Sequence, residues 1–263
     1  LRSSKKYAND AIQVKRMLDG RLRRARKELM KIIDFEKYQN VQLIAKNVLG
    51  EIEEYINPES TEETIVRNCK ELLLKYGINQ TWYYNCPALV LLGSRSCLSV
   101  SGKDYIPAKE KAGTINLITI DLSPLDGEIW GDCSRSYILE EGKIKNINEI
   151  ENEEFKEGII IENKLHEYYL EFVKPEMTFS SIYYEMNRYI NKFGYVNIDF
   201  MNNIGHSIEK NRNDRSYFEE KNINNVTSNM MFTFEPHIKK MDGKWGFKCE
   251  NIYFFNESKL EIL

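Results

Sequence analysis

The order of elements along the chain of 263 residues predicts an α+β fold, in which helices cover one side of a mostly antiparallel sheet. Segments with helical periodicity come first, segments rich in β-forming residues follow, and this succession then repeats. The composition, with 42% hydrophobic and 29% charged residues, is that of a globular domain. No apolar run approaches the roughly 18 residues needed to cross a bilayer, so we expect no membrane protein.

Helix periodicity and end signals justify each helical element. Before the first strand, Asn57-Pro58 ends one helix, and Ser60 is the expected N-cap of the next, with Glu63 three residues later. Gly77 and Gly194 stand where two helices should end. The expected helices are 38–55, 60–77, 152–173 and 178–193, and the expected strands are 88–93, 115–122, 230–234, 245–255 and 260–263.

Charge divides the chain into two parts. Residues 1–40 contain twelve Lys or Arg and five Asp or Glu, so the remainder carries the net negative charge. We therefore predict a basic helical N-terminal extension over 1–39 and one domain over 40–263. The basic residues are interpreted as a solvated helix face, and nucleic acid binding is not expected. The apolar stripe from Leu18 to Ile32 should be buried against the domain or against a second copy, which leaves a homodimer open.

Cysteine usage indicates a reducing compartment. The five cysteines are scattered, and none forms a Cys-x-x-Cys pair. This pattern argues against a zinc knuckle and a redox dithiol, and it suits the cytoplasm.

Five acidic or imidazole residues stand at the ends of predicted strands or in turns. Asp121 closes an apolar run, and Asp132 follows eleven residues later across a turn-forming stretch, so both should lie on neighbouring arms of a hairpin. His206 precedes a loop, Glu235 ends one strand, and Glu250 lies inside another. Gathered carboxylates repel one another unless cations are bound, and two hard cations need bridging carboxylates. Imidazole together with carboxylates suits Mn, Fe, Co or Zn.

These residues stand in motifs that resemble the pita-bread metallohydrolases, a family that includes methionine aminopeptidase, aminopeptidase P, prolidase and creatinase. The resemblance covers about 40–263, and Lys248-Cys249 before Glu250 is most similar to the aminopeptidase P and prolidase branch. The matching segments are Thr119–Leu122, Gly131–Ser136, Val173–Thr178, Gly205–Ile208, Met231–Pro236 and Phe247–Asn251.

The resemblance implies a pita-bread fold and a metal-dependent peptidase that cleaves short peptides near the N-terminus, Xaa-Pro bonds among them. It implies two divalent ions with a bridging water or hydroxide as the nucleophile, and Glu235 as the proton acceptor. One ion would be held by Asp132, His206, Glu235 and Glu250, and the other by Asp121, Asp132 and Glu250.

The chain departs from the family at two histidines that usually lie near the metals. The segment 93–101 contains no histidine, and Asn213 stands at the other position. Strand periodicity could aim His237 at the site, two residues past Glu235, where it would replace one of them. Lys248 could bind a substrate carboxylate. We predict Glu235, His237 and Lys248 as catalytic residues, and the alternative is a non-catalytic member that binds peptide or a protein partner.

Overall fold

The computed structural model describes residues 34–228 and 230–263. Residues 41–263 form one compact unit. Most of the predicted N-terminal extension lies outside the described residues, so its boundary stays a prediction. The helices are residues 34–51, α2 (Glu62–Lys75), α3 (Glu153–Phe172) and α4 (Phe179–Lys192), with 3-10 turns η1 (Ile52–Tyr55), η2 (Gly93–Cys97), η3 (Phe200–Asn202), η4 (Arg212–Asp214) and η5 (Val226–Ser228).

The strands form four sheets, and the strand pairings among the described residues are antiparallel. The orders are β2-β3-β6-β7, β1-β4-β5, β11-β10-β8 and β13-β12-β9. This confirms the predicted α+β class. The strands are β1 (Gln80–Thr81), β2 (Ala88–Leu92), β3 (Asn116–Leu122), β4 (Pro124–Asp126), β5 (Ile129–Trp130), β6 (Cys133–Glu140), β7 (Lys143–Ile144), β8 (Tyr195–Asn197), β9 (Met231–Phe234), β10 (His237–Lys240), β11 (Gly246–Lys248), β12 (Asn251–Asn256) and β13 (Lys259–Ile262).

Two expectations about local structure were wrong. The N-cap of α2 is Thr61 and not Ser60, because the Thr61 hydroxyl accepts the Thr64 N–H, whereas the Ser60 hydroxyl accepts the N–H of Asn57. The expected strand 245–255 is two strands, β11 and β12, separated at the position of Glu250. The sequence also did not predict β10.

Alternation along β3 separates a helix-facing side from a polar side. Ile118, Ile120 and Leu122 are fully buried in a core shared with α2 and β2. Thr119 and Asp121, at the intervening positions, line a cavity instead. The period of two therefore directs the Asp121 carboxylate away from the helix-covered core.

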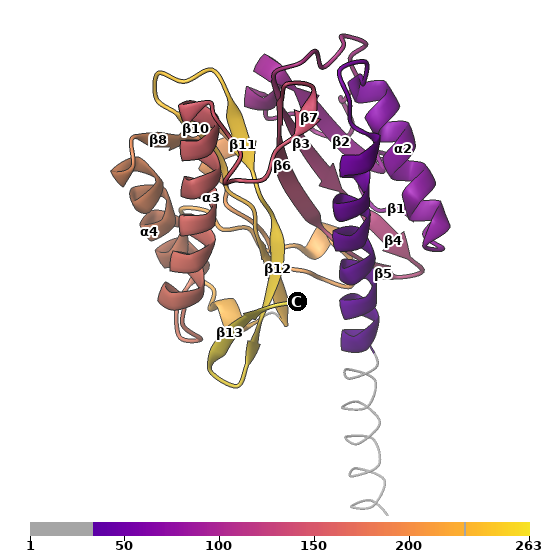
Figure 1. Cartoon of the computed structure of the whole chain (residues 1–263). Helices are drawn as coiled ribbons and strands as arrows, with labels where there is room; N and C mark the ends of the chain where they lie inside the picture. Colours follow the sequence, from indigo (N-terminus) through magenta and orange to yellow (C-terminus); the bar gives the residue numbers. More distant parts are fainter. Residues whose placement is uncertain (1–33, 229) are drawn as a thin grey trace, which may run out of the picture. The chain divides into compact units, whose positions relative to one another are not determined.

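A second core lies in the C-terminal half, where α3 and α4 pack on the later strands (Figure 1). Its centre is aromatic: Tyr169 stacks on Phe234 with ring centroids 4.0 Å apart, and Phe179 contacts Phe218. Bridges between Ser134 and Glu250 join this half to β6 of the first half. Each core therefore supports one group of strands: the first core supports β2, β3 and β6, and the second core supports β8 to β13.

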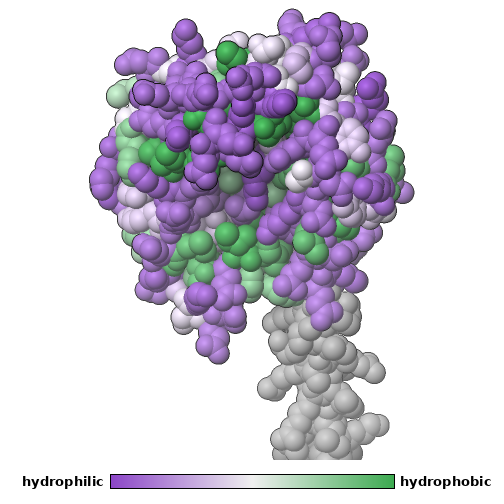
Figure 2. Space-filling model, viewed as in Figure 1, coloured by the Kyte–Doolittle hydropathy of each residue, from purple (hydrophilic) through white to green (hydrophobic). Residues whose placement is uncertain are grey.

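Among the described residues, no helix combines the length and apolar character needed to cross a bilayer. The face shown in Figure 2 is mostly hydrophilic, with apolar side chains in separate patches.

Candidate metal centre

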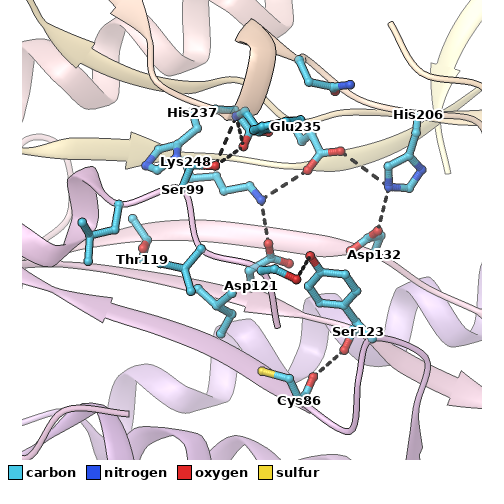
Figure 3. Close-up of a pocket in the computed structure, with 18 of the residues that line it drawn as sticks. Cys86, Ser99, Thr119, Asp121, Ser123, Asp132, His206, Glu235, His237 and Lys248 are labelled. Carbon is cyan, nitrogen blue, oxygen red and sulfur yellow. Dashed lines mark hydrogen bonds and ion pairs between the residues drawn. The ribbon is translucent and has the colours of Figure 1, made fainter. Parts of the chain in front are cut away.

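A cavity of about 660 Å³ is bordered by both groups of strands. Figure 3 shows the acidic and imidazole side chains that converge in it. The predicted site residues in its lining are Asp121, Asp132, His206, Glu235, His237 and Lys248.

Cross-strand register brings the two aspartates together from the first half. Asp121 on β3 is paired with Ser134 on β6, and Asp132 lies two residues before Ser134. Both aspartates are therefore directed to the same face. The Gln42 side chain fixes the main chain of Asp132, accepting its N–H (3.2 Å) and donating to its carbonyl (2.7 Å). This leaves the Asp132 carboxylate available to the cavity.

A glycine allows His206 to approach the end of β9. At Gly205 the φ angle is 144°, and an added Cβ would lie less than 3.0 Å from the Thr233 carbonyl oxygen. The main chains of His206 and Thr233 then bond, since the Thr233 N–H donates to the His206 carbonyl (2.7 Å). His206 Nδ1 is 3.1 Å from the Ser207 carbonyl and is assigned as the donor, so Nε2 carries the free lone pair.

His206 Nε2 faces two carboxylates at distances longer than those of a good hydrogen bond. It lies 3.4 Å from Asp132 Oδ2 and 3.6 Å from Glu235 Oε1, beyond the normal range of a hydrogen bond. Donors that share one ion, each about 2.0–2.2 Å from it, lie roughly 3.0–3.5 Å apart. One potential ligand atom each from Asp132, His206 and Glu250 lies within 4.8 Å of the others. This spacing fits a divalent cation.

The Glu250 carboxylate gives the clearest indication that this group of potential ligand atoms binds a cation. Its side chain is fully buried, and neither carboxylate oxygen has a hydrogen-bond partner among the described residues. Its main-chain N–H donates to the Ser134 carbonyl (3.0 Å), which holds the residue in the break between β11 and β12. Because an unpaired buried carboxylate is costly, the residues fit a bound metal.

The carboxylates of the site perturb one another. Burial first, and then the neighbouring charges of Asp132 and Glu235, raise the pKa of Glu250 well above its ordinary value. Burial is also the main cause that raises the pKa of Asp132 to about 7, and it raises the pKa of Asp121. A divalent cation would reverse these shifts by stabilising the charged forms.

Lys248 lies between two of these carboxylates. Its Nζ is 2.7 Å from Asp121 Oδ2 and 3.2 Å from Glu235 Oε2 (Figure 3). Burial alone would raise the pKa of Glu235, but the Lys248 ammonium and His206 outweigh it and lower that pKa. Asp121 is thus bound by an ammonium group and is not one of the three grouped potential ligands.

His237 lies on β10 opposite Lys248 on β11. Its Nε2 is 2.6 Å from the Ser96 carbonyl and is therefore assigned as a donor, which leaves Nδ1 as an acceptor. Burial, followed by the Lys248 charge, lowers the pKa of His237 to about 4. The ring is neutral at pH 7.

Aromatic side chains surround His206, and most of them were missed in the sequence. The ring centroids of Trp130, Tyr217 and Trp82 lie 5.9, 5.8 and 6.2 Å from that of His206. The Arg215 guanidinium lies 4.9 Å from the centroid of Trp82. Nothing in the local sequence marks Arg215 and Tyr217, because their loop has no periodicity.

Comparisons with solved structures find proteins of the same fold. The solved X-Pro aminopeptidase from Thermotoga maritima is similar over 87% of this chain and 60% of its own, with 21% identity and a TM-score of 0.72. The prolidase from Pyrococcus furiosus is similar over 87% and 63%, with 18% identity and a TM-score of 0.72. The methionine aminopeptidase from Rickettsia prowazekii is similar over 87% and 96%, with 19% identity and a TM-score of 0.64.

At these identities the solved structures show the fold alone. The chain spans about 60% of the length of the X-Pro aminopeptidase and prolidase structures. A search of curated proteins finds no significant match. The model of metallopeptidase family M24, however, matches residues 36–257, which is most of the chain. Together with the fold, this match shows that the chain belongs to metallopeptidase family M24.

Proposed function

We propose that the protein is a divalent-metal-dependent peptidase that hydrolyses an amide bond near the N-terminus of short peptides, Xaa-Pro bonds among them. The observation that carries the proposal is the buried Glu250 carboxylate, unpartnered among the described residues and grouped with Asp132 and His206. The cavity beside it is large enough for a short peptide. Membership of the M24 family supports the same reaction class.

The proposed cofactors are two divalent ions, drawn from Mn, Fe, Co and Zn. Asp132, His206, Glu235 and Glu250 would hold one ion, and Asp121, Asp132 and Glu250 the other. Bound ions would supply a Lewis acid for the substrate carbonyl and a nucleophilic water of lowered pKa. To bind the second ion, the Asp121 carboxylate must either contact the ion and the Lys248 ammonium together or release the ammonium.

Two side chains have roles that follow from their surroundings. The lowered pKa of Glu235 keeps it ionised at neutral pH, so it can accept a proton from the attacking water. The Lys248 ammonium, 3.2 Å away, maintains that charge. His237 presents an acceptor, Nδ1, so it would accept a substrate N–H and would not stabilise an oxyanion.

The test is turnover of a dipeptide panel that includes Xaa-Pro, with Mn, Co or Zn added. We expect hydrolysis that a chelator abolishes, and Glu235→Gln should lower kcat by at least a hundredfold. Glu71→Gln, at an exposed position on α2, is the matched control. Tight metal binding without turnover on a broad panel would contradict the proposal and support the non-catalytic binding protein.

We also propose a cytoplasmic location, since all five cysteines are free thiols. The homodimer stays a prediction, which light scattering of the purified protein would test.

A further inference from the structure

We infer that Arg135 is a positioning residue of the metal centre, because it holds the main chain of Glu250 against β6 and thereby sets the place of the Glu250 carboxylate. The inference deepens the proposed function and rests on the metal centre proposed there. Arg135 is not among the described residues that line the cavity, so it is assigned neither a ligand role nor a contact with substrate.

Glu250 lies where two strand ladders of the C-terminal half end. The ladder of β11 with β10 ends at Lys248, opposite His237, and the ladder of β12 with β9 begins at Asn251, opposite Phe234. Glu250 has no partner in either of these ladders. Its carboxylate cannot fix it either, because neither oxygen has a hydrogen-bond partner among the described residues. The main chain of Glu250 must therefore be held by other contacts.

Residues of β6 supply these contacts. The Glu250 N–H donates to the Ser134 carbonyl (3.0 Å), and the Glu250 carbonyl accepts from Arg135 Nη1 (2.7 Å). The same nitrogen donates to the Ser134 carbonyl (2.6 Å), and Nη2 donates to Asn251 Oδ1 (2.8 Å). One guanidinium thus joins β6 to Glu250 and to the first residue of β12.

Alternation along β6 places the guanidinium behind the metal centre. Arg135 is paired with Ile120, which is fully buried in the helix-facing core, whereas the adjacent pair is Asp121 with Ser134. Successive side chains of a strand point to opposite faces, so the Arg135 side chain leaves the sheet on the face away from Asp121. It borders a separate cavity of about 280 Å³. Arg135 therefore acts on the main chain of Glu250 and not on the ions.

The chemistry of arginine suits this task. A guanidinium is planar and carries N–H donors in fixed directions, whereas a lysine ammonium is one nitrogen on a flexible stem. No ion pair between Arg135 and a carboxylate is found among the described residues, so its contribution lies in the hydrogen bonds to main chain and amide oxygens. The Cys133 thiol also contacts the Glu250 carbonyl (3.5 Å), but a thiol is a weak donor and cannot replace the guanidinium.

The two carboxylates proposed to bridge the ions come from different halves of the fold. Asp132 belongs to the first half, where Gln42 holds its main chain, and Glu250 belongs to the second. Arg135 fixes Glu250 to the strand that follows Asp132, so it sets the separation of the two carboxylates. Replacing residues that orient metal ligands typically changes metal affinity by about tenfold to a hundredfold. We expect a loss of this size without Arg135.

The experiment compares wild type with Arg135→Met, Arg135→Lys and Tyr137→Phe. Tyr137 is the matched control, because it also lies on β6 and its hydroxyl donates to a main-chain carbonyl, that of Leu49 (2.6 Å). Mn²⁺ affinity is measured by calorimetry well below the melting temperature of each protein. Arg135→Met should bind Mn²⁺ about tenfold to a hundredfold more weakly than wild type, and Arg135→Lys should be intermediate. Tyr137→Phe should be less stable than wild type but should bind Mn²⁺ within about twofold of it.

A second measurement needs no metal. Amide hydrogen exchange of residues 249–251 in chelator should be about tenfold faster in Arg135→Met than in wild type, and unchanged in Tyr137→Phe. Wild-type Mn²⁺ affinity or wild-type exchange in Arg135→Met would overturn the inference, as would an equal loss of affinity in Tyr137→Phe. Should Arg135→Met not fold, Arg135→Lys decides, because full wild-type affinity and exchange would exclude a role for the guanidinium.

Failure of the inference can be told from failure of the proposed function. Wild type that binds no Mn²⁺ would refute the proposed metal centre, and the exchange rates would then decide the inference alone. Weakened Mn²⁺ binding in Arg135→Met, with no hydrolysis by wild type, would refute only the peptidase proposal. Hydrolysis by wild type with Mn²⁺ binding indifferent to Arg135 would refute only this inference.

Discussion

Replacing Glu250 by glutamine should stabilise the metal-free protein while weakening its response to metal. The Glu250 carboxylate is fully buried, has no hydrogen-bond partner among the described residues, and has a pKa raised well above its ordinary value. The folded metal-free protein therefore holds a proton that the unfolded chain releases above about pH 4.3. Glutamine has nearly the same shape but does not titrate, so it does not make the stability of the protein depend on pH.

The magnitude follows from that difference in protonation. Because the folded-state pKa is raised, the stability of wild type falls by about 1.4 kcal/mol for each pH unit between about 4.3 and the folded pKa. Between about pH 4.3 and pH 7 this loss cannot exceed about 4 kcal/mol, and the neighbouring carboxylates, which titrate together with Glu250, reduce it. For a chain of this length the Glu250→Gln protein should melt about 5–10 °C higher in a chelating buffer. At pH 4 the difference should disappear.

The assay is thermal denaturation with chelator and with Mn²⁺. Wild type should gain about 2.7 kcal/mol at a hundredfold excess of metal over Kd, and Glu250→Gln much less. Glu162→Gln is the matched control, since Glu162 is also buried with a raised pKa but contacts Ser136 and is outside the donor set. The Glu162→Gln protein should keep the full gain in stability on addition of Mn²⁺. A metal-free Glu250→Gln protein less stable than wild type, or one with an undiminished gain, would refute this reasoning.

Three further changes have defined outcomes. Lys248→Met removes the ammonium partner of the partly buried Asp121 and of Glu235, and should cost up to about 3–5 kcal/mol in chelator, measured by urea unfolding; an unchanged midpoint would show that the ion pairs contribute nothing. Metal affinity should fall below pH 7, by about tenfold per pH unit for each proton displaced, because Asp132 has a pKa raised to about 7 and keeps its proton until then. Calorimetry in buffers of different ionisation enthalpy measures how many protons are released when the metal binds, and a release of zero protons would contradict the expectation. Gly205→Ala should push the chain off the Thr233 carbonyl and weaken Mn²⁺ binding more than tenfold, whereas Gly50→Ala, with open space around it, should leave binding unchanged.

Much of the fold was predictable because local signals coincide with the elements. Thr178 caps α4 as its position after Pro175 suggests, and Gly194 follows its end with a positive φ. Alternation in β3 also predicts which face carries Asp121. These features depend on neighbouring residues, which a single sequence displays.

What the sequence could not supply depends on distant residues. The break between β11 and β12 occurs because Glu250 bonds to Ser134 on another sheet. The pairing of Lys248 with Asp121 joins positions 127 residues apart. Likewise, the place of Arg215 in the cavity follows from the path of a loop and not from any motif. The assignment of the ligands to individual ions stays a prediction.

The most direct test of the central claim, that these side chains form a divalent-metal site, is an anomalous difference map of crystals grown with Mn²⁺. The account predicts a peak about 2.0–2.5 Å from Asp132, His206 Nε2 and Glu250, and a second peak beside Asp121. Saturating Mn²⁺ with no peak at these residues, or with peaks only elsewhere on the protein, would contradict it.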